Sequence, residues 1–318
     1  MLVLKIDVDT LRGTRAGVPR LAELLSRAGA GASFLFSLGP DHTGRAIKRV
    51  FRRGFMNKVS RTSVMSHYGL TTLLYGTALP GPDIGRRCSA VLRDVKERGF
   101  EVGIHCWDHV AWQDGVGQAD PAWTERHMNL AVQRFIEIFD EAPRLHGAAG
   151  WQMNRHALRL TQRLGFTCAS DCRGQHPFIP VWDGEVVHCP QLPTTLPTLD
   201  ELIGIENVTA QNVADVILAR TRNAHALHVF TLHAELEGMK LAPVFERLLQ
   251  GWRGQGHELV DLRTALASLD RGRLPRHRIE IGSVPGRSGT LLIQGDEFLG
   301  GAPPALASPQ ARNPLFLR

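Results

Sequence analysis

Alternating strand and helix patterns constrain the fold of this chain more than any other feature of its sequence. Residues 1–8 form an apolar, β-branched run typical of a buried strand, residues 17–28 have a helical period, and residues 32–38 form a second strand-like run. Such an alternation predicts parallel strands with helices outside them, and 318 residues suffice for one large α/β domain. Strand patterns recur near 101–105, 144–148, 166–170, 186–189, 227–232 and 257–260, and helical patterns at 86–98, 122–140, 154–164, 209–222, 241–254 and 262–269.

Two acidic residues, Asp7 and Asp9, end the first predicted strand. On an extended backbone residues i and i+2 point to the same side, so both carboxylates should lie together. Two like charges held this close repel each other, and their burial costs more still, unless a cation or a shared proton lies between them. The alternative is that both acids only cap the loop that follows.

Two histidines follow another predicted strand about a hundred residues later. His105 and His109 are four positions apart, which places both imidazoles on one face if the strand turns directly into a helical turn. One carboxylate and two imidazoles form a three-ligand site that leaves room for water and substrate, and they suit Zn, Co, Mn or Fe about equally. Cys106 is adjacent to His105 and should point the other way. The sequence therefore favours a site for one divalent metal ion.

These motifs together resemble the polysaccharide deacetylase family with its NodB-type domain. The D-x-D of residues 7–9, the H-x-x-x-H of residues 105–109 and the T-L-H-A-E of residues 231–235 occur in the family order. Residues 148–151 and 170–174 extend the resemblance to one branch, the deformylases that act on a formamido-arabinose carried by undecaprenyl phosphate. The resemblance covers residues 2–265 and implies a distorted, incomplete (β/α) barrel, with a catalytic domain at residues 1–269.

The resemblance also implies roles for individual residues. Asp9, His105 and His109 would hold the metal, Asp7 would act as general base, and His233 would protonate the leaving amine. A metal in such a site makes water acidic and stabilises a developing oxyanion.

For three further residues, the sequence suggests a role in the site but does not decide it. Asp171 could orient His233, or it could only cap a turn. The family has an Arg-x-Pro motif whose arginine braces the base, and this chain has residues 146–151 in its place, so Arg173 is the candidate partner of Asp7. Trp151 could form a wall of the sugar pocket, or it could be a core residue.

Residues 40–85 interrupt the alternation and are expected to form an inserted segment that faces the membrane. Apolar residues at helical spacing lie opposite basic ones between residues 45 and 61, a pattern that also suits a solvated face packed on its own domain. Residues 68–80 add further apolar surface. The predicted membrane contacts are Arg49, Phe51, Arg52, Arg53, Phe55 and Lys58.

The partners and the location are predicted from the same features. No apolar stretch is long enough to span a membrane, and the chain enters a strand directly rather than a secretory signal. We expect a peripheral protein on the cytoplasmic side of the bacterial inner membrane, bound to an anionic membrane surface and to a lipid-linked sugar on its undecaprenyl phosphate carrier. Five cysteines without a zinc-binding spacing fit a reducing compartment.

The net charge of +6 raises the question of a nucleic-acid partner. Much of the excess lies in residues 45–61 and no nucleic-acid motif accompanies it, so we expect no nucleic acid. Residues 270–318 lack helical periodicity and are predicted to form a poorly ordered tail, with a possible short strand at 289–294.

The predicted function is the metal-dependent removal of a formyl group from this lipid-linked amino sugar, as a step of lipid A modification and polymyxin resistance. A second possibility is an N-deacetylase that acts on an N-acetylated glycan. A third is a catalytically silent glycolipid-binding domain, which the full set of ligand and acid–base residues disfavours.

Overall fold

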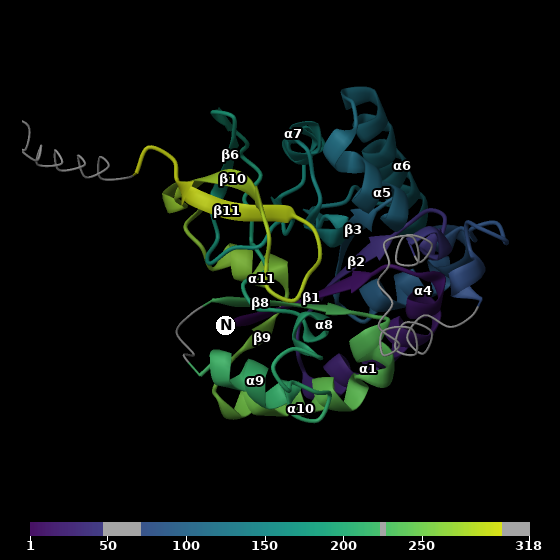
Figure 1. The fold of residues 1–318 in the computed structure, drawn as a ribbon, viewed down its shortest axis with the longest axis vertical. Coiled ribbons are helices and arrows are strands. Elements are labelled where there is room, and N and C mark those ends of the chain that lie inside the picture. Colours follow the sequence, from purple (N-terminus) through teal and green to yellow (C-terminus); the bar gives the residue numbers. More distant parts are fainter. Residues whose placement is uncertain (47–70, 223–226, 301–318) are drawn as a thin grey trace, which may run out of the picture.

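A parallel sheet forms the centre of the protein (Figure 1). The computed structural model describes residues 1–46, 71–222 and 227–300. Within these ranges the sheet has seven strands in the order β5-β4-β3-β2-β1-β8, with β9 paired to β1. The strands are β1 (Leu2–Val8), β2 (Ser33–Ser37), β3 (Glu101–Cys106), β4 (Leu145–His146), β5 (Cys168–Ala169), β8 (His228–His233) and β9 (Leu259–Val260).

The sheet curls without closing into a complete barrel. Its edge strands β5 and β8 form no ladder with each other in the described part of the chain. Residues 191–196 lie between them instead, since Leu192 N donates to Ala169 O (2.8 Å) of β5 and Thr195 N to Val229 O (3.1 Å) of β8. The predicted fold, a distorted and incomplete (β/α) barrel, is confirmed.

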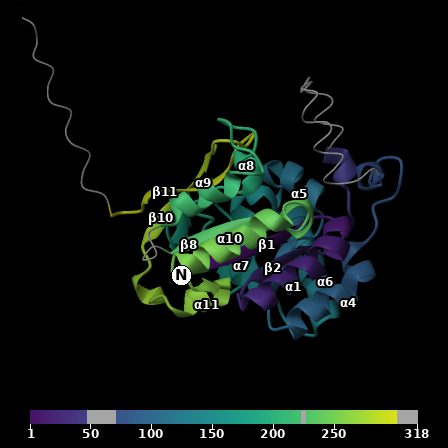
Figure 2. The same ribbon diagram turned by 90° about the horizontal axis from the view of Figure 1, so that it is seen from below.

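Amphipathic helices cover the outside of the sheet. Figure 1 shows α1, α9 and α10 on one side of β1 and β8, and Figure 2 shows α10 across the front of the same strands. Each helix buries an apolar face, as α1 does with Leu21 and Leu25. The helices are α1 (Val18–Ala28), α4 (Ile84–Glu97), α5 (His109–Gly115), α6 (Pro121–Phe139), α7 (Arg155–Arg163), α8 (Leu199–Leu202), α9 (Val213–Arg220), α10 (Ala242–Gly254) and α11 (Leu262–Ala267).

Strand β1 lies in the interior of the sheet and is buried along its whole length. It pairs with β8 in parallel, with Asp7 opposite His233, and with β2, which in turn pairs with β3. Because the strands are parallel, the carboxyl ends of β1, β3 and β8 meet at one edge of the sheet. This arrangement brings the predicted acids and histidines together.

The predicted poorly ordered tail is wrong for most of residues 270–300. Strand β10 (Arg276–Gly282) pairs with β11 (Leu291–Glu297) on one side and with β6 (Ile179–Trp182) on the other, and β6 pairs with β7 (Glu185–Val186). Ile279, Leu291 and Leu292 are buried there, which provides the apolar contact that a second sheet needs. The expected strand at 289–294 overlaps β11, and residues 301–318 lie outside the described part.

The predicted membrane segment is described only at its two ends. Pro40 and Asp83 form a bridge that brings these ends together, and Leu74 and Leu79 expose 44% and 40% of their surface. The predicted contacts Arg49, Phe51, Arg52, Arg53, Phe55 and Lys58 all lie in residues 47–70, outside the described residues. None of the helices in the described ranges is long and apolar enough to cross a bilayer.

Two π-helical turns, Gly13–Gly17 after β1 and Leu236–Lys240 after β8, pack against each other through glycine. A Cβ atom on Gly17 would lie 2.0 Å from Ala234 O, and one on Gly238 would lie 2.7 Å from Gly17 Cα. Only glycine permits so close an approach of two backbones. This contact fixes the loops that follow Asp9 and His233.

We predict that Gly17→Ala destabilises the protein by about 1–3 kcal/mol, because the added methyl group overlaps a backbone carbonyl that cannot move freely. The matched control is Gly254→Ala at the end of α10, where a Cβ atom would meet nothing within 4 Å. This control should leave stability unchanged or raise it by about 0.4–1 kcal/mol. Urea unfolding measures both changes, and a Gly17→Ala protein as stable as the control would refute the close-contact argument.

Candidate active site

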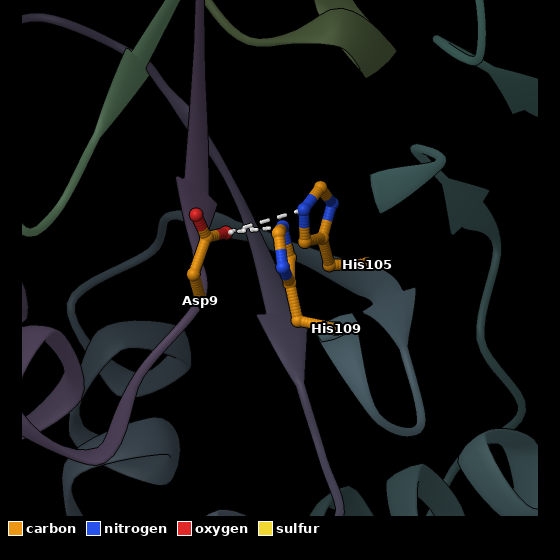
Figure 3. Close-up of side chains that lie close together, drawn as sticks. All are labelled: Asp9, His105 and His109. Carbon is orange, nitrogen blue, oxygen red and sulfur yellow. Dashed lines mark ion pairs between the residues drawn. The ribbon is translucent and has the colours of Figure 1, made fainter. Parts of the chain in front are cut away.

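Asp9, His105 and His109 form a cluster at the carboxyl edge of the sheet (Figure 3). Asp9 Oδ1 lies 3.2 Å from His105 Nε2 and 3.5 Å from His109 Nε2. One ligand atom from each residue fits within 4.8 Å of the other two. The structure therefore brings together the three residues that the sequence assigned to a metal.

Local structure orients the two imidazoles. His105 is the next-to-last residue of β3, and its Nδ1 lies 2.6 Å from Gly147 O, which leaves Nε2 directed at Asp9. Asp108 caps the amino end of α5 by accepting a hydrogen bond from Ala111 N, so that the helix begins at His109. The rings of His105 and His109 are stacked with centroids 5.4 Å apart. Cys106 lies against Ser37 and is outside the cluster, as expected.

The donor set fits a divalent cation. Asp9 Oδ1 and Asp7 Oδ1 are buried and have no hydrogen-bond partner among the described residues, so acceptor capacity is left for an ion. Burial would raise the pKa of Asp9, but His109 and His105 lower it far below its usual range. Burial would lower the pKa of His105, yet Asp7 and Asp9 raise it. The two carboxylates thus favour a proton on His105, and a cation placed between these groups would offset the same negative charge in its place.

Asp7 is paired with Lys5 rather than with Arg173. Lys5 Nζ donates to Asp7 Oδ2 at 3.1 Å, and both residues are buried. Arg173 instead donates twice to Glu201, at 2.7 and 2.9 Å. The choice of Arg173 as the partner of Asp7 was wrong. Lys5 lies two positions before Asp7 on the same face of β1, which is a signal that the sequence contained.

His233 ends β8, and its imidazole forms an ion pair with Asp200. His233 Nδ1 lies 3.9 Å from Asp200 Oδ1, which is too far for a hydrogen bond, and Glu237 accepts a hydrogen bond from the backbone N–H of His233 at 2.7 Å. Burial would lower the pKa of His233, but the charges of Asp200, Asp9 and Glu237 raise it to about 9. These carboxylates favour the protonated form of the imidazole.

The predicted contact of Asp171 with His233 is absent. Asp171 is fully buried and accepts hydrogen bonds from His146 Nδ1 (2.7 Å) and Ala148 N (2.8 Å). It stabilises the loop after β4, which carries the Gly147 carbonyl that orients His105. Asp171 therefore contacts His146 and the loop after β4, and it affects the site only through the position of that loop.

Glu235 is a site residue to which the sequence analysis gave no role. Its Oε1 accepts hydrogen bonds from Thr10 N, Thr10 Oγ1 (both 2.8 Å) and Asp9 N (3.1 Å). Burial and then the charge of Asp9 raise its pKa to about 8. Glu235 thereby fixes the turn that carries Asp9. The T-L-H-A-E motif already contained this residue.

A cavity of about 150 Å³ contains the cluster, Asp7 and His233. Trp151 lines it although the residue is only 1% exposed, so the residue is both a wall of the cavity and part of the core. Its Nε1 donates to Thr194 Oγ1 (3.2 Å). Arg287 lines the cavity too, from the segment that was predicted to be a disordered tail.

Comparison with known proteins agrees with this geometry. No family model matches the chain. A probable 4-deoxy-4-formamido-L-arabinose-phosphoundecaprenol deformylase of Shewanella sediminis is 39% identical over 77% of this chain and 79% of its own length. A protein of the same description from Wigglesworthia glossinidia brevipalpis is 31% identical over 89% of this chain and 98% of its own length.

Solved structures match the fold as well. A putative polysaccharide deacetylase from Mycobacterium smegmatis superposes with a TM-score of 0.60 at 14% identity, over 89% of this chain and 94% of that protein. The two sequence relatives are 39% and 31% identical over 77% and 89% of this chain, so they identify its family more narrowly than the fold does. The chain belongs to the family of 4-deoxy-4-formamido-L-arabinose-phosphoundecaprenol deformylases.

Proposed function

We propose that this protein is a metal-dependent deformylase that hydrolyses the N-formyl group of 4-deoxy-4-formamido-L-arabinose carried on undecaprenyl phosphate. The products are formate and the free amino sugar, which serves lipid A modification and polymyxin resistance. The observation that carries the proposal is the placement of a three-ligand cluster, an acid and a histidine whose protonated form is favoured in one cavity. The substrate is the one named for the relatives that are 39% and 31% identical.

Asp9, His105 and His109 would hold one divalent ion through a carboxylate oxygen and two imidazole nitrogens. When bound, such an ion acts as a Lewis acid on the formyl oxygen and makes a water more acidic. Three protein ligands leave positions open for a substrate.

Asp7 is suited to accept a proton from the water that attacks the formyl carbon. Its Oδ1 has no hydrogen-bond partner in the described part of the chain, whereas Oδ2 is held by Lys5 at 3.1 Å. Lys5 therefore fixes the orientation of the carboxylate and offsets its charge. The free oxygen remains available for proton transfer.

His233 is suited to give a proton to the sugar nitrogen as the C–N bond breaks. It lies opposite Asp7 in the β1–β8 register, and the carboxylates around it raise its pKa, which favours the protonated form that can donate. The overall balance is one water consumed, a new C–O bond in formate and a proton transferred to the amine. Two acid–base groups on adjacent strands serve both proton transfers.

Release of formate distinguishes this function from the alternatives. We expect the purified, metal-loaded protein to release formate from the lipid-linked formamido sugar, and no acetate from an N-acetylated chito-oligosaccharide. Enzymatic assays for formate and acetate measure both. Acetate release alone would establish the glycan deacetylase instead. Neither product, in the presence of bound metal, would favour the non-catalytic binding domain.

We predict that Asp9→Ala and His105→Ala lose the metal, because each removes a ligand atom from the cluster. Asp7→Asn should keep the metal and lower kcat by roughly 10²–10⁴-fold, as expected for the loss of a general base. Metal analysis after gel filtration and a turnover assay separate the two classes. Asp183→Asn, in the exposed turn between β6 and β7, is the control. A metal-free Asp7→Asn protein would reverse the roles of the two acids.

Peripheral membrane binding by residues 45–61 is part of the proposal. Cations near an anionic surface contribute about 1 kcal/mol each, so replacement of Arg49, Arg52, Arg53 and Lys58 by Glu should release the protein from anionic liposomes. Activity on the full lipid substrate should fall, whereas a short-chain, water-soluble analogue should be hydrolysed as before. Liposome sedimentation and the two assays test this. Equal losses on both substrates would assign the segment to the fold or the pocket.

A further inference from the structure

Arg287 reaches the active-site cavity from a part of the chain far from the catalytic strands. It lies in the connection between β10 and β11, which Figure 1 shows in yellow, and it lines the same cavity as Asp9 and His233. Its guanidinium lies 4.6 Å from the centre of the Trp151 ring. The connection between β10 and β11 thus contributes a positive charge to a cavity whose other ionisable lining residues are acids and histidines.

The connection that carries Arg287 is fixed against the rest of the protein. A Cβ atom on Gly286 would lie 1.9 Å from Glu201 O, so this segment packs directly on the backbone of α8, and φ at Gly286 is +82°. Further along, Gln152 donates to Thr290 O, and Arg173 N donates to Leu292 O at 2.9 Å. The position of Arg287 is therefore set by backbone contacts on both sides of it.

Arg287 shares its ion-pair partner in the described part of the protein, Glu201, with Arg173. Its Nη1 lies 3.8 Å from Glu201 Oε1, beyond hydrogen-bond distance. Glu201 is already satisfied, because Arg173 donates to both of its oxygens. The Arg287 side chain is only 19% exposed. A guanidinium that is mostly withdrawn from water and makes no hydrogen bond has donors available for a ligand.

The size of the cavity indicates which part of a ligand would meet this charge. About 150 Å³ is below the roughly 300–1,000 Å³ of sites that enclose a drug-sized ligand, so one sugar can enter while the group attached to it stays at the edge. In the substrate named for the relatives, that group is a phosphate. Guanidinium binds phosphate through two parallel hydrogen bonds.

We propose that Arg287 binds the phosphate that links the sugar to its lipid carrier, and so selects phosphate-linked sugars over neutral glycosides. This inference rests on the proposed function, since it places the formamido group of the same sugar at Asp9, His105 and His109. Trp151, stacked beneath the guanidinium, holds it in place.

The test compares two substrates that share the same formamido sugar, one linked through phosphate to a short isoprenyl chain and one a neutral alkyl glycoside. Arg287→Gln should lower kcat/KM on the phosphate-linked substrate by roughly 10–100-fold, chiefly through KM, as expected for the loss of a charged hydrogen bond. On the neutral glycoside it should match the wild type. Arg287→Lys should recover part of the loss. Arg273→Gln, an exposed arginine before β10, is the matched control and should change neither rate.

Equal losses on both substrates would overturn the inference, because Arg287 would then support only Trp151 or the fold. Binding of geranyl phosphate, measured by calorimetry on the metal-loaded protein, gives a readout without turnover. Wild type and Arg273→Gln should bind it, and Arg287→Gln roughly tenfold or more weakly. Binding that depends on Arg287 without formate release would refute the proposed function alone, whereas formate release with binding unaffected by Arg287→Gln would refute this inference alone.

Discussion

Repulsion between the carboxylates of Asp7 and Asp9 is the constraint on which the rest of the site depends. Both acids lie at the end of a buried central strand, where two unpaired charges would be costly. The two charges are compensated by different partners. Lys5 pairs with Asp7, and two imidazoles surround Asp9. One acid is thereby kept for proton transfer, and the other is left with the geometry of a metal ligand.

The fold makes this division possible by bringing distant segments to one edge of the sheet. Parallel pairing places Asp7 beside His233, and the β3–α5 junction supplies both imidazoles. Surrounding groups then fix each side chain: Glu235 holds the turn of Asp9, and Gly147 O orients His105. Such supporting contacts are what give a catalytic site its precision. The connection between β10 and β11 adds Arg287 to the same cavity.

The sequence predicted the strands of the main sheet, most of the helices and the metal cluster because each depends on local patterns or on short spacings. Asp9, His105 and His109 follow strands whose carboxyl ends must meet in a parallel sheet. Asp171 and Arg173 were given the wrong partners because partner choice depends on three-dimensional distances: His146 and Glu201 are nearer to them than His233 and Asp7. Strand β10 was missed because most of its residues are exposed and form no apolar run, and its pairing with β6 is a long-range contact.

The most direct test of this account is anomalous diffraction from crystals of the metal-loaded protein. The account predicts one divalent ion bound by Asp9 Oδ1, His105 Nε2 and His109 Nε2, with Asp7 outside the coordination sphere and still paired with Lys5. An ion bound by Asp7, or located away from this cluster, would contradict it.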